Sequence, residues 1–365
     1  MKVLMPVGVI CLSLASNVLG DAGPAAGEAP APAPQQAPQI ATFSIVARDP
    51  HTGDYGVAVQ SRYFAVGDVV PHARAKVGAV ATQARGNLLY GPQGLALLEK
   101  GLAAEQVIRQ LIAPDQLREE RQVGLVDQAG RVASYTGDKA LEWAGGRTGA
   151  GYAVQGNMLA GPQVVDAIAT AFEAAPGDFA TRLVYALAAG QAAGGDARGR
   201  QSAALLVARE KGGYLGLTDR YIDLHVEDHP TPIRELARLL RIRQAQFLSK
   251  QAKALVTQAE ETRGTDRAAL LEEARGLMLE ALEKHRSDDY GWWTLARIHM
   301  MEGQPQEAAL AAQRALLENP AWRHLSVANR EALEVSTELL DALLRVESFN
   351  RVWYSLAADN EAVVQ

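Results

Sequence analysis

The sequence predicts a mixed α/β domain with antiparallel sheets over residues 42–228, followed by an all-helical domain. Short runs rich in β-branched residues begin at Thr42 and come in pairs, and the helical stretches between them also come in pairs. From Pro232 onward the strand signals stop, and Ala, Leu, Glu, Gln and Arg dominate. Single strands alternating with single helices are typical of a doubly wound parallel sheet. Paired elements therefore favour antiparallel sheets packed against helices.

Turn residues bound each expected strand. Strands are expected at residues 43–47, 56–60, 77–83, 123–126, 151–155, 203–208 and 221–226. The segment DPHTGD at 49–54 joins the first two strands as a hairpin. Helices are expected at residues 91–100, 103–112, 162–174 and 178–189.

Residues 1–20 have the pattern of a secretory signal peptide. Its apolar run, residues 7–19, is too short to span a bilayer, so we expect cleavage after Gly20 and no stable membrane anchor. Residues 21–41 are rich in Ala, Pro and Gln and are expected to form a linker or pro-segment. The mature protein is therefore expected in the periplasm or outside the cell, without its only cysteine, Cys11.

Composition and motifs argue against several classes of function. The net charge of -6 gives no reason to expect a nucleic-acid partner. The sequence has no dinucleotide-binding or P-loop glycine pattern and no histidine pair at metal-ligand spacing, so no cofactor and no metal are expected. It also lacks a Gly-x-Ser-x-Gly elbow. His72 and His225 are isolated in the sequence and receive no role.

Glycine-rich polar segments at the expected strand ends are the candidates for function, because loops there carry function more often than cores do. They are QSR at 60–62, TQARGN at 82–87, QGN at 155–157 and GGDARGRQS at 194–202. The last combines Asp196, Arg198, Arg200 and Ser202 with glycines that permit close backbone approach, which suits a carboxylate or an oxyanion. The other interpretation is a tight turn in which Asp196 pairs with one of the arginines.

Long strings of this sequence resemble the family known as domain of unknown function 1028. They are TFSIVARDPHTGDYGVAVQSRYFAVGDVVPHARAKVGAVATQARGN, YGPQGLALLEKG, RQVGLVD, YAVQGNMLAGPQVVDAIATAFE and AAGGDARGRQSAALLV, in that order over residues 42–240. That family is assigned to the N-terminal-nucleophile hydrolase superfamily. The resemblance implies a four-layer α+β sandwich, with two antiparallel sheets between helical layers.

The resemblance also implies that Thr42 is the nucleophile, with its own α-amine as the base. An α-amine with a pKa of about 7.7–8.0 can accept the proton of a Thr hydroxyl at neutral pH. However, Thr42 does not begin this chain, and an acylated nitrogen is not basic. Either a cleavage between Ala41 and Thr42 exposes the amine, or the domain is not a hydrolase of this mechanism. In the second case Thr42 is a β-branched residue that opens a strand.

Supporting roles follow from the same analogy. A cation near the nucleophile would come from Arg62 or Arg74, and Asn87 or the backbone around Asn157 would donate to the oxyanion. Gln155, Asn157, Asp196, Arg198, Arg200 and Ser202 are the expected substrate-binding residues. Each of these also has an interpretation as a hydrogen-bonding residue that stabilises a loop.

The helical domain, expected at residues 231–350 with a tail at 351–365, matches the tetratricopeptide repeat. A 34-residue repeat that begins at Asp289 aligns Trp292, Leu295, Ala296, Ala308, Ala315 and Pro320 with the expected pattern. A helix at residues 327–346 would cap the array. Such modules bind a peptide or protein on a concave face, where Trp292, Trp293 and His299 are candidates. Alternatively the tryptophans are core, and the module packs on the first domain or forms a homo-oligomer.

The leading hypothesis is an exported amidohydrolase-like protein that acts on an amide or peptide-like substrate. The alternative is a non-catalytic ligand- or protein-binding envelope protein that uses the polar loops and the helical repeats. A purely structural envelope protein accounts for the repeats but not for the charged glycine loop at 194–202.

Overall fold

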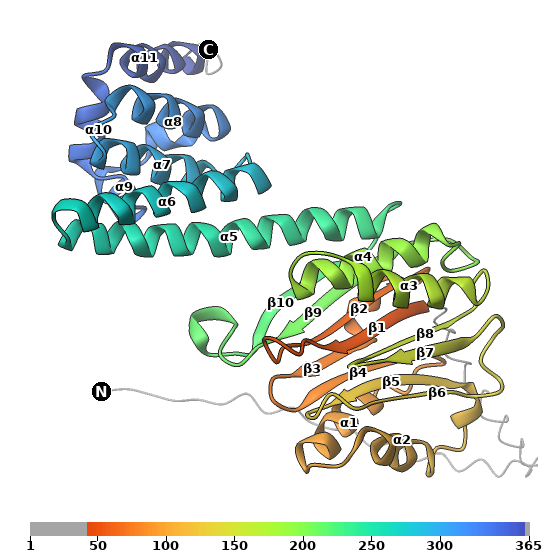
Figure 1. The fold of residues 1–365 in the computed structure, drawn as a ribbon. Helices are drawn as coiled ribbons and strands as arrows, with labels where there is room; N and C mark the ends of the chain where they lie inside the picture. The colour runs from red at the N-terminus through yellow and green to blue at the C-terminus, as the bar shows by residue number, and fades with distance from the viewer. Residues whose placement is uncertain (1–41, 362–365) are drawn as a thin grey trace, which may run out of the picture. The chain divides into compact units, whose positions relative to one another are not determined.

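The computed structural model describes residues 42–361, with side chains up to residue 354. The expected signal peptide at 1–20 and linker at 21–41 lie outside the described residues. Two antiparallel sheets and a helical C-terminal region make up the described chain (Figure 1), which confirms the predicted antiparallel sheets and the change to helices near Pro232. Within these residues no helix is both long enough and apolar enough to cross a membrane.

The larger sheet has six strands, with β1 near its middle. Its order is β10 (Arg220–Val226), β9 (Ser202–Ala208), β2 (Tyr55–Ser61), β1 (Thr42–Arg48), β8 (Tyr152–Asn157) and β7 (Gly145–Gly149). The second sheet has the order β3 (Pro71–Arg74), β4 (Gly78–Ala84), β5 (Arg121–Asp127) and β6 (Val132–Thr136). The predicted hairpin joins β1 to β2, where Gly53 takes a φ of 76° and its amide donates to the Asp49 carbonyl at 2.9 Å.

Three strands escape the sequence prediction, namely β3, β6 and β7. All three are edge strands of four or five residues. Strand β3 begins at Pro71, and β7 has the sequence GGRTG, which contains no β-branched residue except Thr148. For β3 and β7, pairing with the neighbouring strands rather than their own propensity makes them extended, whereas β6 (VASYT) carries strand-forming Val, Tyr and Thr and is simply short.

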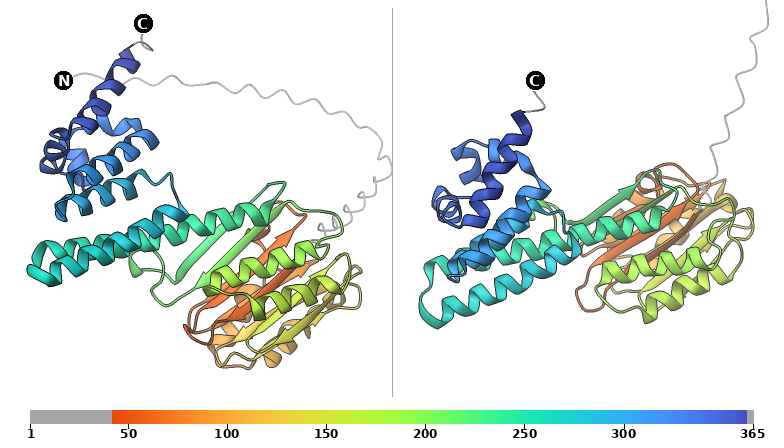
Figure 2. Two further views of the ribbon diagram at one scale, coloured as in Figure 1. Left: turned by 45° about the horizontal axis from the view of Figure 1, so that its top comes forward. Right: turned by 90° about the horizontal axis from the view of Figure 1, so that it is seen from above.

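The two sheets pack face to face, and helices cover their outer faces. Alternate residues of β1 separate the two sides: Phe43 and Ile45 face the helices, whereas Val46 faces the other sheet with Val59 and Ala81. Helices α3 (Gln163–Ala174) and α4 (Phe179–Ala192) lie on the six-stranded sheet (Figures 1 and 2). Helices α1 (Tyr90–Glu99) and α2 (Ala104–Ile112) lie on the four-stranded sheet.

Helix α5 (Pro232–Glu261) crosses the boundary expected between the two domains. Its first turns bury Ile233, Leu236 and Leu240 in the core that α3 and α4 form with the six-stranded sheet. Its later turns bury residues such as Val256 in the core of the helical region. A single helix therefore belongs to both cores, and Pro232 occupies its first position, where a missing amide hydrogen costs nothing.

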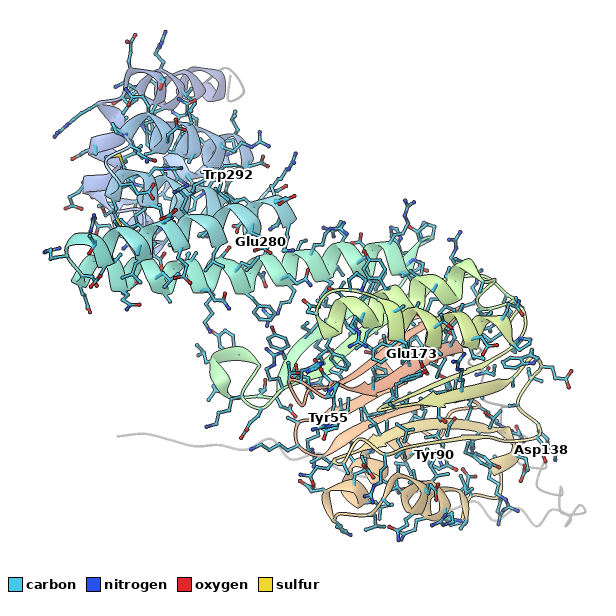
Figure 3. The ribbon with its side chains drawn as sticks, viewed as in Figure 1. Tyr55, Tyr90, Asp138, Glu173, Glu280 and Trp292 are labelled. Carbon is cyan, nitrogen blue, oxygen red and sulfur yellow. The ribbon has the colours of Figure 1, made fainter. Side chains whose placement is uncertain are left out.

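The helical region continues from α5 in pairs joined by short loops. Its helices are α6 (Gly264–Lys284), α7 (Asp289–Met301), α8 (Pro305–Glu318), α9 (Val327–Ala332), α10 (Thr337–Leu344) and α11 (Glu347–Glu361). The helix expected at 327–346 is broken, because Glu334 takes a φ of 66° between α9 and α10. Trp293 is buried, and Trp292 on α7 (Figure 3) is half-buried and donates to the Arg286 carbonyl at 2.8 Å.

Candidate functional site

Four polar residues form a row across the six-stranded sheet where β1 begins. Thr42 pairs with Ser61 on one side and with Asn157 on the other, and Ser61 pairs with Ser202. Directly opposite residues in antiparallel strands share a face, so all four side chains point toward the four-stranded sheet. The Thr42 hydroxyl donates to the Ser61 hydroxyl at 3.1 Å. The row thus places Thr42 between a second hydroxyl and a side-chain amide.

Polar residues of both sheets extend this row into a buried network. Ser44 donates through its hydroxyl to Gln83 Oε1 at 2.6 Å and accepts from Gln155 Nε2 at 2.6 Å. Gln83 Nε2 in turn donates to Gln122 Oε1 at 2.8 Å and, more weakly, to the Thr42 carbonyl at 3.4 Å. The intersheet space is therefore apolar around Val46 but polar at the end where β1 begins.

We call this network the hydroxyl–amide cluster. Its members are Thr42, Ser44, Ser61, Gln83, Gln122, Gln155, Asn157 and Ser202, each no more than 2% exposed. Asn157 joins it by donating from Nδ2 to Gln122 Oε1 at 3.0 Å. All eight side chains carry hydroxyl or amide groups, and none of these groups titrates near neutral pH. The side chains of the cluster therefore supply hydrogen-bond donors and acceptors but no base.

The loop at 194–202 lies beside the cluster. The Gln201 amide donates to the Ser61 carbonyl at 3.0 Å, and the Ala197 amide donates to the Met158 carbonyl at 2.9 Å, so the loop contacts the end of β2 and the residue that follows β8. Asp196 is buried within it and accepts from the Arg62 amide at 2.9 Å and from the Arg198 guanidinium at 3.0 Å. The turn held by an Asp196–Arg198 pair, one of the two sequence interpretations, is present.

An open groove of about 890 Å³ runs along this loop. Its other wall is the start of α5, from Thr231 to Arg234, together with residues of α4. Arg198, Arg200 and Arg234 all line it. Among the described residues, the guanidinium groups of Arg200 and Arg234 have no hydrogen-bond or ion-pair partner, so they can bind an anionic ligand.

The two arginines expected to provide a cation lie in different places. Arg62 follows Ser61 directly, but its side chain is exposed and its Nη1 donates to the Arg200 carbonyl at 3.4 Å. Arg74 pairs with Glu99 at 2.8 Å on the surface. Arg74 is the strand partner of Gly78, which begins β4, whereas Gln83 lies near the other end of β4. The structure therefore brings Arg62 near the row of Thr42 and leaves Arg74 away from it.

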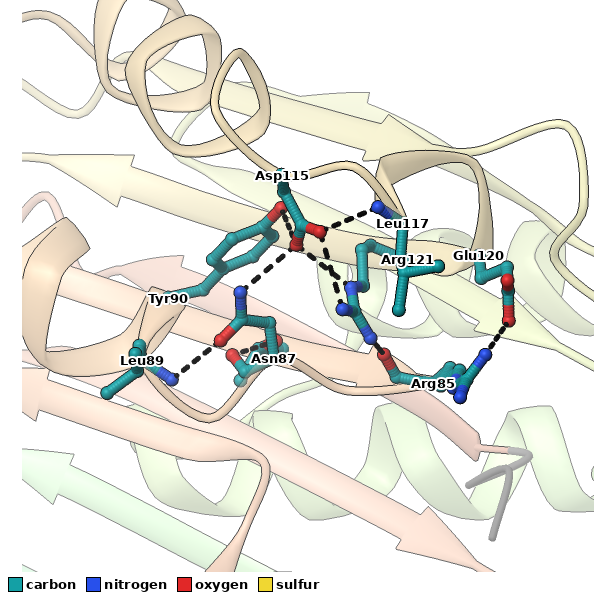
Figure 4. Close-up of polar contacts among 9 residues, drawn as sticks. Arg85, Asn87, Leu89, Tyr90, Asp115, Leu117, Glu120 and Arg121 are labelled. Carbon is teal, nitrogen blue, oxygen red and sulfur yellow. Dashed lines mark hydrogen bonds and ion pairs between the residues drawn. The ribbon is translucent and has the colours of Figure 1, made fainter. Parts of the chain in front are cut away.

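Asn87 belongs to a second polar network, centred on Asp115 (Figure 4). Asp115 accepts from Asn87 Nδ2 at 3.0 Å, from the Tyr90 hydroxyl at 2.9 Å and from Arg121 Nε at 3.0 Å. Burial by itself raises the pKa of Asp115, but these hydrogen bonds outweigh burial and hold the pKa below its usual range.

Arg121 precedes Gln122 on β5, so its side chain leaves the opposite face of the sheet from the cluster. The Asn87 side chain consequently shapes the adjoining loop rather than the surroundings of Thr42.

Several cluster residues were missed as site residues, although the sequence carries a signal for them. Ser44, Gln83 and Gln122 interrupt strands that are otherwise apolar, at positions that alternation assigns to a buried face. A polar residue inside a buried strand requires a partner. The packing of one sheet on the other decides which strands supply these partners. The local sequence does not specify that packing.

Comparison with known proteins places the first region in a family. A family model described as "Family of unknown function (DUF1028)" matches residues 42–236. A crystal structure of protein SPO2555 from Silicibacter pomeroyi, described with the same family, is 32% identical and superposes with a TM-score of 0.51. The match covers 55% of this chain and 88% of that protein. No curated protein matches.

Proposed function

The chain belongs to the DUF1028 family, and we propose that it is an exported amide hydrolase whose nucleophile is the Thr42 hydroxyl. The observation that carries the proposal is the position of Thr42. It begins a central strand, its hydroxyl is held by Ser61, and buried amide side chains surround it. Helices outside two face-to-face antiparallel sheets also agree with the four-layer sandwich of N-terminal-nucleophile hydrolases.

The chemistry requires a base that the cluster does not contain. Hydroxyl and amide groups cannot take up a proton at neutral pH, whereas the α-amine of an N-terminal Thr42 can. The hydroxyl proton would pass to that amine as Oγ1 bonds to the substrate carbonyl. The C–N bond then breaks, the proton leaves with the amine product, and water hydrolyses the acyl ester on Thr42. Removal of residues up to Ala41 is therefore part of the proposal.

Asn157 is the proposed donor to the oxyanion. Its side-chain amide has two hydrogens, and one bonds to Gln122 Oε1 at 3.0 Å. Asn157 is also the strand partner of Thr42, so its second hydrogen lies on the same face of the sheet as the nucleophile. A fixed donor in a buried site stabilises the charge that develops on the carbonyl oxygen.

The substrate proposed is an amide or peptide-like molecule that carries a carboxylate. The loop that lines the groove bonds to the Ser61 carbonyl, so the groove lies at the same end of β2 as Thr42 and its strand partners. Arg200 and Arg234 supply positive charge there, and arginine binds carboxylates through paired N–H groups.

The test compares two proteins that differ by one residue. A chain released by a specific protease to begin at Thr42 should hydrolyse a chromogenic amide panel, with the fastest rates for members that carry a carboxylate. The chain that begins at Ala41 should be inactive, because its Thr42 nitrogen is an amide. Thr42→Ser should keep activity and Thr42→Ala should lose it while remaining folded.

Two results would refute the hydrolase proposal. One is that the chain that begins at Ala41, or the Thr42→Ala variant, is as active as the chain that begins at Thr42. The other is a protein that retains residues 21–41 in its own cells and stays inactive when trimmed. A non-catalytic binding protein that uses the same groove then becomes the better account.

The helical region is proposed to be of tetratricopeptide type and to bind a protein partner. Helix α7 begins at Asp289, the start of the expected repeat, and Ala308 and Ala315 are buried where α7 and α8 pack. Short loops join α5 to α6 and α7 to α8, as in antiparallel helix pairs. The full chain should capture a protein partner, and a chain that lacks the residues after 262 should not. Capture by the helical region alone would also support this assignment.

A further inference from the structure

His225, which received no role from the sequence, lies between carboxylates at the end of β10. Its Nδ1 atom is 3.6 Å from Asp68 Oδ1 and 3.5 Å from Glu227 Oε1. Its other ring nitrogen, Nε2, is 3.0 Å from Asp223 Oδ1. One ligand atom each from Asp68, His225 and Glu227 lies within 4.8 Å of the other two. We propose that these three residues bind a divalent metal ion, with Zn²⁺ as the best match.

The spacing suits a metal better than direct hydrogen bonds. Protein N–H···O bonds are usually about 2.7–3.2 Å long, shorter than either Nδ1 contact. Zinc binds histidine nitrogen and carboxylate oxygen at about 2.0–2.2 Å. Two such ligands at a tetrahedral angle are about 3.3–3.6 Å apart. Nδ1 is separated from both oxygens by distances of this size.

The ring is already oriented for this role. Nε2 bonds to Asp223, which also pairs with Arg220 on the same strand. A carboxylate that accepts from one ring nitrogen fixes the tautomer and leaves the other nitrogen as a metal ligand. In His225 that remaining nitrogen is Nδ1, the atom that faces Asp68 and Glu227.

The backbone holds the ligands together although they lie far apart in sequence. Asp68 belongs to a short 3-10 helix, η1 (Val66–Asp68), which packs on the end of β10. The Ala65 amide donates to the Glu227 carbonyl at 3.1 Å and fixes this contact. Gly67 makes room for the ring, because a Cβ atom there would lie 2.7 Å from His225 Nδ1.

Charge also favours a cation at this position. Asp68, Asp223 and Glu227 are three carboxylates around one imidazole, and Arg220 neutralises one of them. Glu227 Oε2 is shielded from solvent and has no hydrogen-bond partner among the described residues. The Asp68 side chain is 68% exposed, so water can complete the coordination. A bound ion would tie the loop after Arg62 to β10.

The test uses untagged protein, freed of metal by a chelator, and Zn²⁺ alone as the probe. Competition with a chromophoric chelator should give one Zn²⁺ per chain with micromolar or tighter affinity. Asp68→Asn, His225→Asn and Glu227→Gln should each weaken binding at least about ten-fold. His299→Asn is the control, because His299 faces a single carboxylate, Glu302, and its loss should leave binding unchanged.

A second measurement keeps the result clear if a variant folds poorly. Asp68 is exposed at the end of the short helix η1, so Asp68→Asn should retain the circular dichroism of the parent. Co²⁺ in place of Zn²⁺ should give the visible absorption of a tetrahedral site in the parent and not in Asp68→Asn. No stoichiometric binding, or binding that the folded Asp68→Asn variant retains unchanged, would overturn the proposal.

Discussion

Gly124 of β5 lies directly against the side-chain amide of Gln155 of β8, and this contact joins the two sheets at the hydroxyl–amide cluster. A Cβ atom on Gly124 would lie 1.9 Å from Gln155 Oε1. The absence of a side chain at residue 124 therefore allows Gln155 to reach Ser44, to which it donates at 2.6 Å.

Gly124→Ala should destabilise the protein by about 1–3 kcal/mol, since a methyl group overpacks a full interior. It should also displace Gln155 and reduce any activity of the trimmed chain. Gly276→Ala on α6 is the control. No atom lies within 4 Å of the added Cβ there, and alanine should stabilise the helix by about 0.5–1 kcal/mol. Urea unfolding of both variants measures the difference, and equal effects would refute the packing argument.

Asp115→Asn should cost roughly 2–3 kcal/mol, because it leaves Arg121, whose side chain is only 11% exposed, without its charged partner. Glu99→Gln, which breaks an exposed pair with Arg74, should cost less than about 1 kcal/mol. Unfolding by urea at neutral pH compares them. Similar losses in the two variants would show that burial does not strengthen the Asp115 pair.

The same carboxyl predicts a pH dependence. The folded-state pKa of Asp115 lies below its unfolded value, so the folded protein binds fewer protons there. The stability that this group contributes is present above the ordinary carboxyl pKa of about 3.9 and falls as pH drops below it. Stability measured from pH 6 to 2 should fall less steeply in Asp115→Asn. An unchanged slope would assign the acid sensitivity to other carboxylates.

Arg198 and Arg200 should behave differently although they lie only two residues apart in the loop. Arg200→Ala should weaken binding of a dicarboxylate probe several-fold while costing less than about 0.5 kcal/mol of stability, since its guanidinium has no hydrogen-bond or ion-pair partner in the described part of the chain. Arg198→Ala should cost roughly 1–3 kcal/mol, because it removes the ionic partner of Asp196, whose side chain is fully buried. Calorimetric titration measures binding of the probe, and urea unfolding measures stability. Equal losses of stability in the two variants would contradict this prediction.

A chain that ends at residue 230 should be much less stable than one that ends at residue 243. The shorter chain lacks Ile233, Leu236 and Leu240, which complete the core under α4, and each such side chain contributes about 1.5–3 kcal/mol when buried. We expect a melting temperature at least about 10 °C lower for the shorter chain.

For the same reason, a helical fragment that begins at residue 242 should be more soluble than one that begins at Thr231. The second fragment exposes Ile233, Leu236 and Leu240, which are buried in the parent protein. Both fragments should be helical by circular dichroism. Equal melting temperatures of the chains that end at residues 230 and 243 would show that the first turns of α5 do not stabilise the first core.

Local sequence determined most of the elements of this protein. The seven expected strands and the helices at α1 to α4 appear within a few residues of their predicted bounds, because alternation, turn residues and helix-starting prolines act over short distances. Helix α7 begins at Asp289, the residue at which the sequence predicted the start of a helical repeat. The edge strands β3 and β7 needed partners to become strands, because Pro71 and the glycines of β7 do not favour an extended strand by themselves.

The surroundings of each candidate residue were decided by tertiary structure. Thr42 could be identified as the start of a strand, but Ser61, Gln83 and Asn157 reach it only through strand register and the packing of two sheets. In the sequence, Arg74 was as suitable a cation as Arg62, and Asn87 was a candidate oxyanion donor. In the structure Arg74 lies at the far end of β4, and the Asn87 side chain bonds to Asp115. His225 and Asp68 are separated by most of the first domain and meet because η1 packs on β10. The sequence determines which chemical groups each segment carries, whereas contacts between segments distant in sequence determine which of these groups meet.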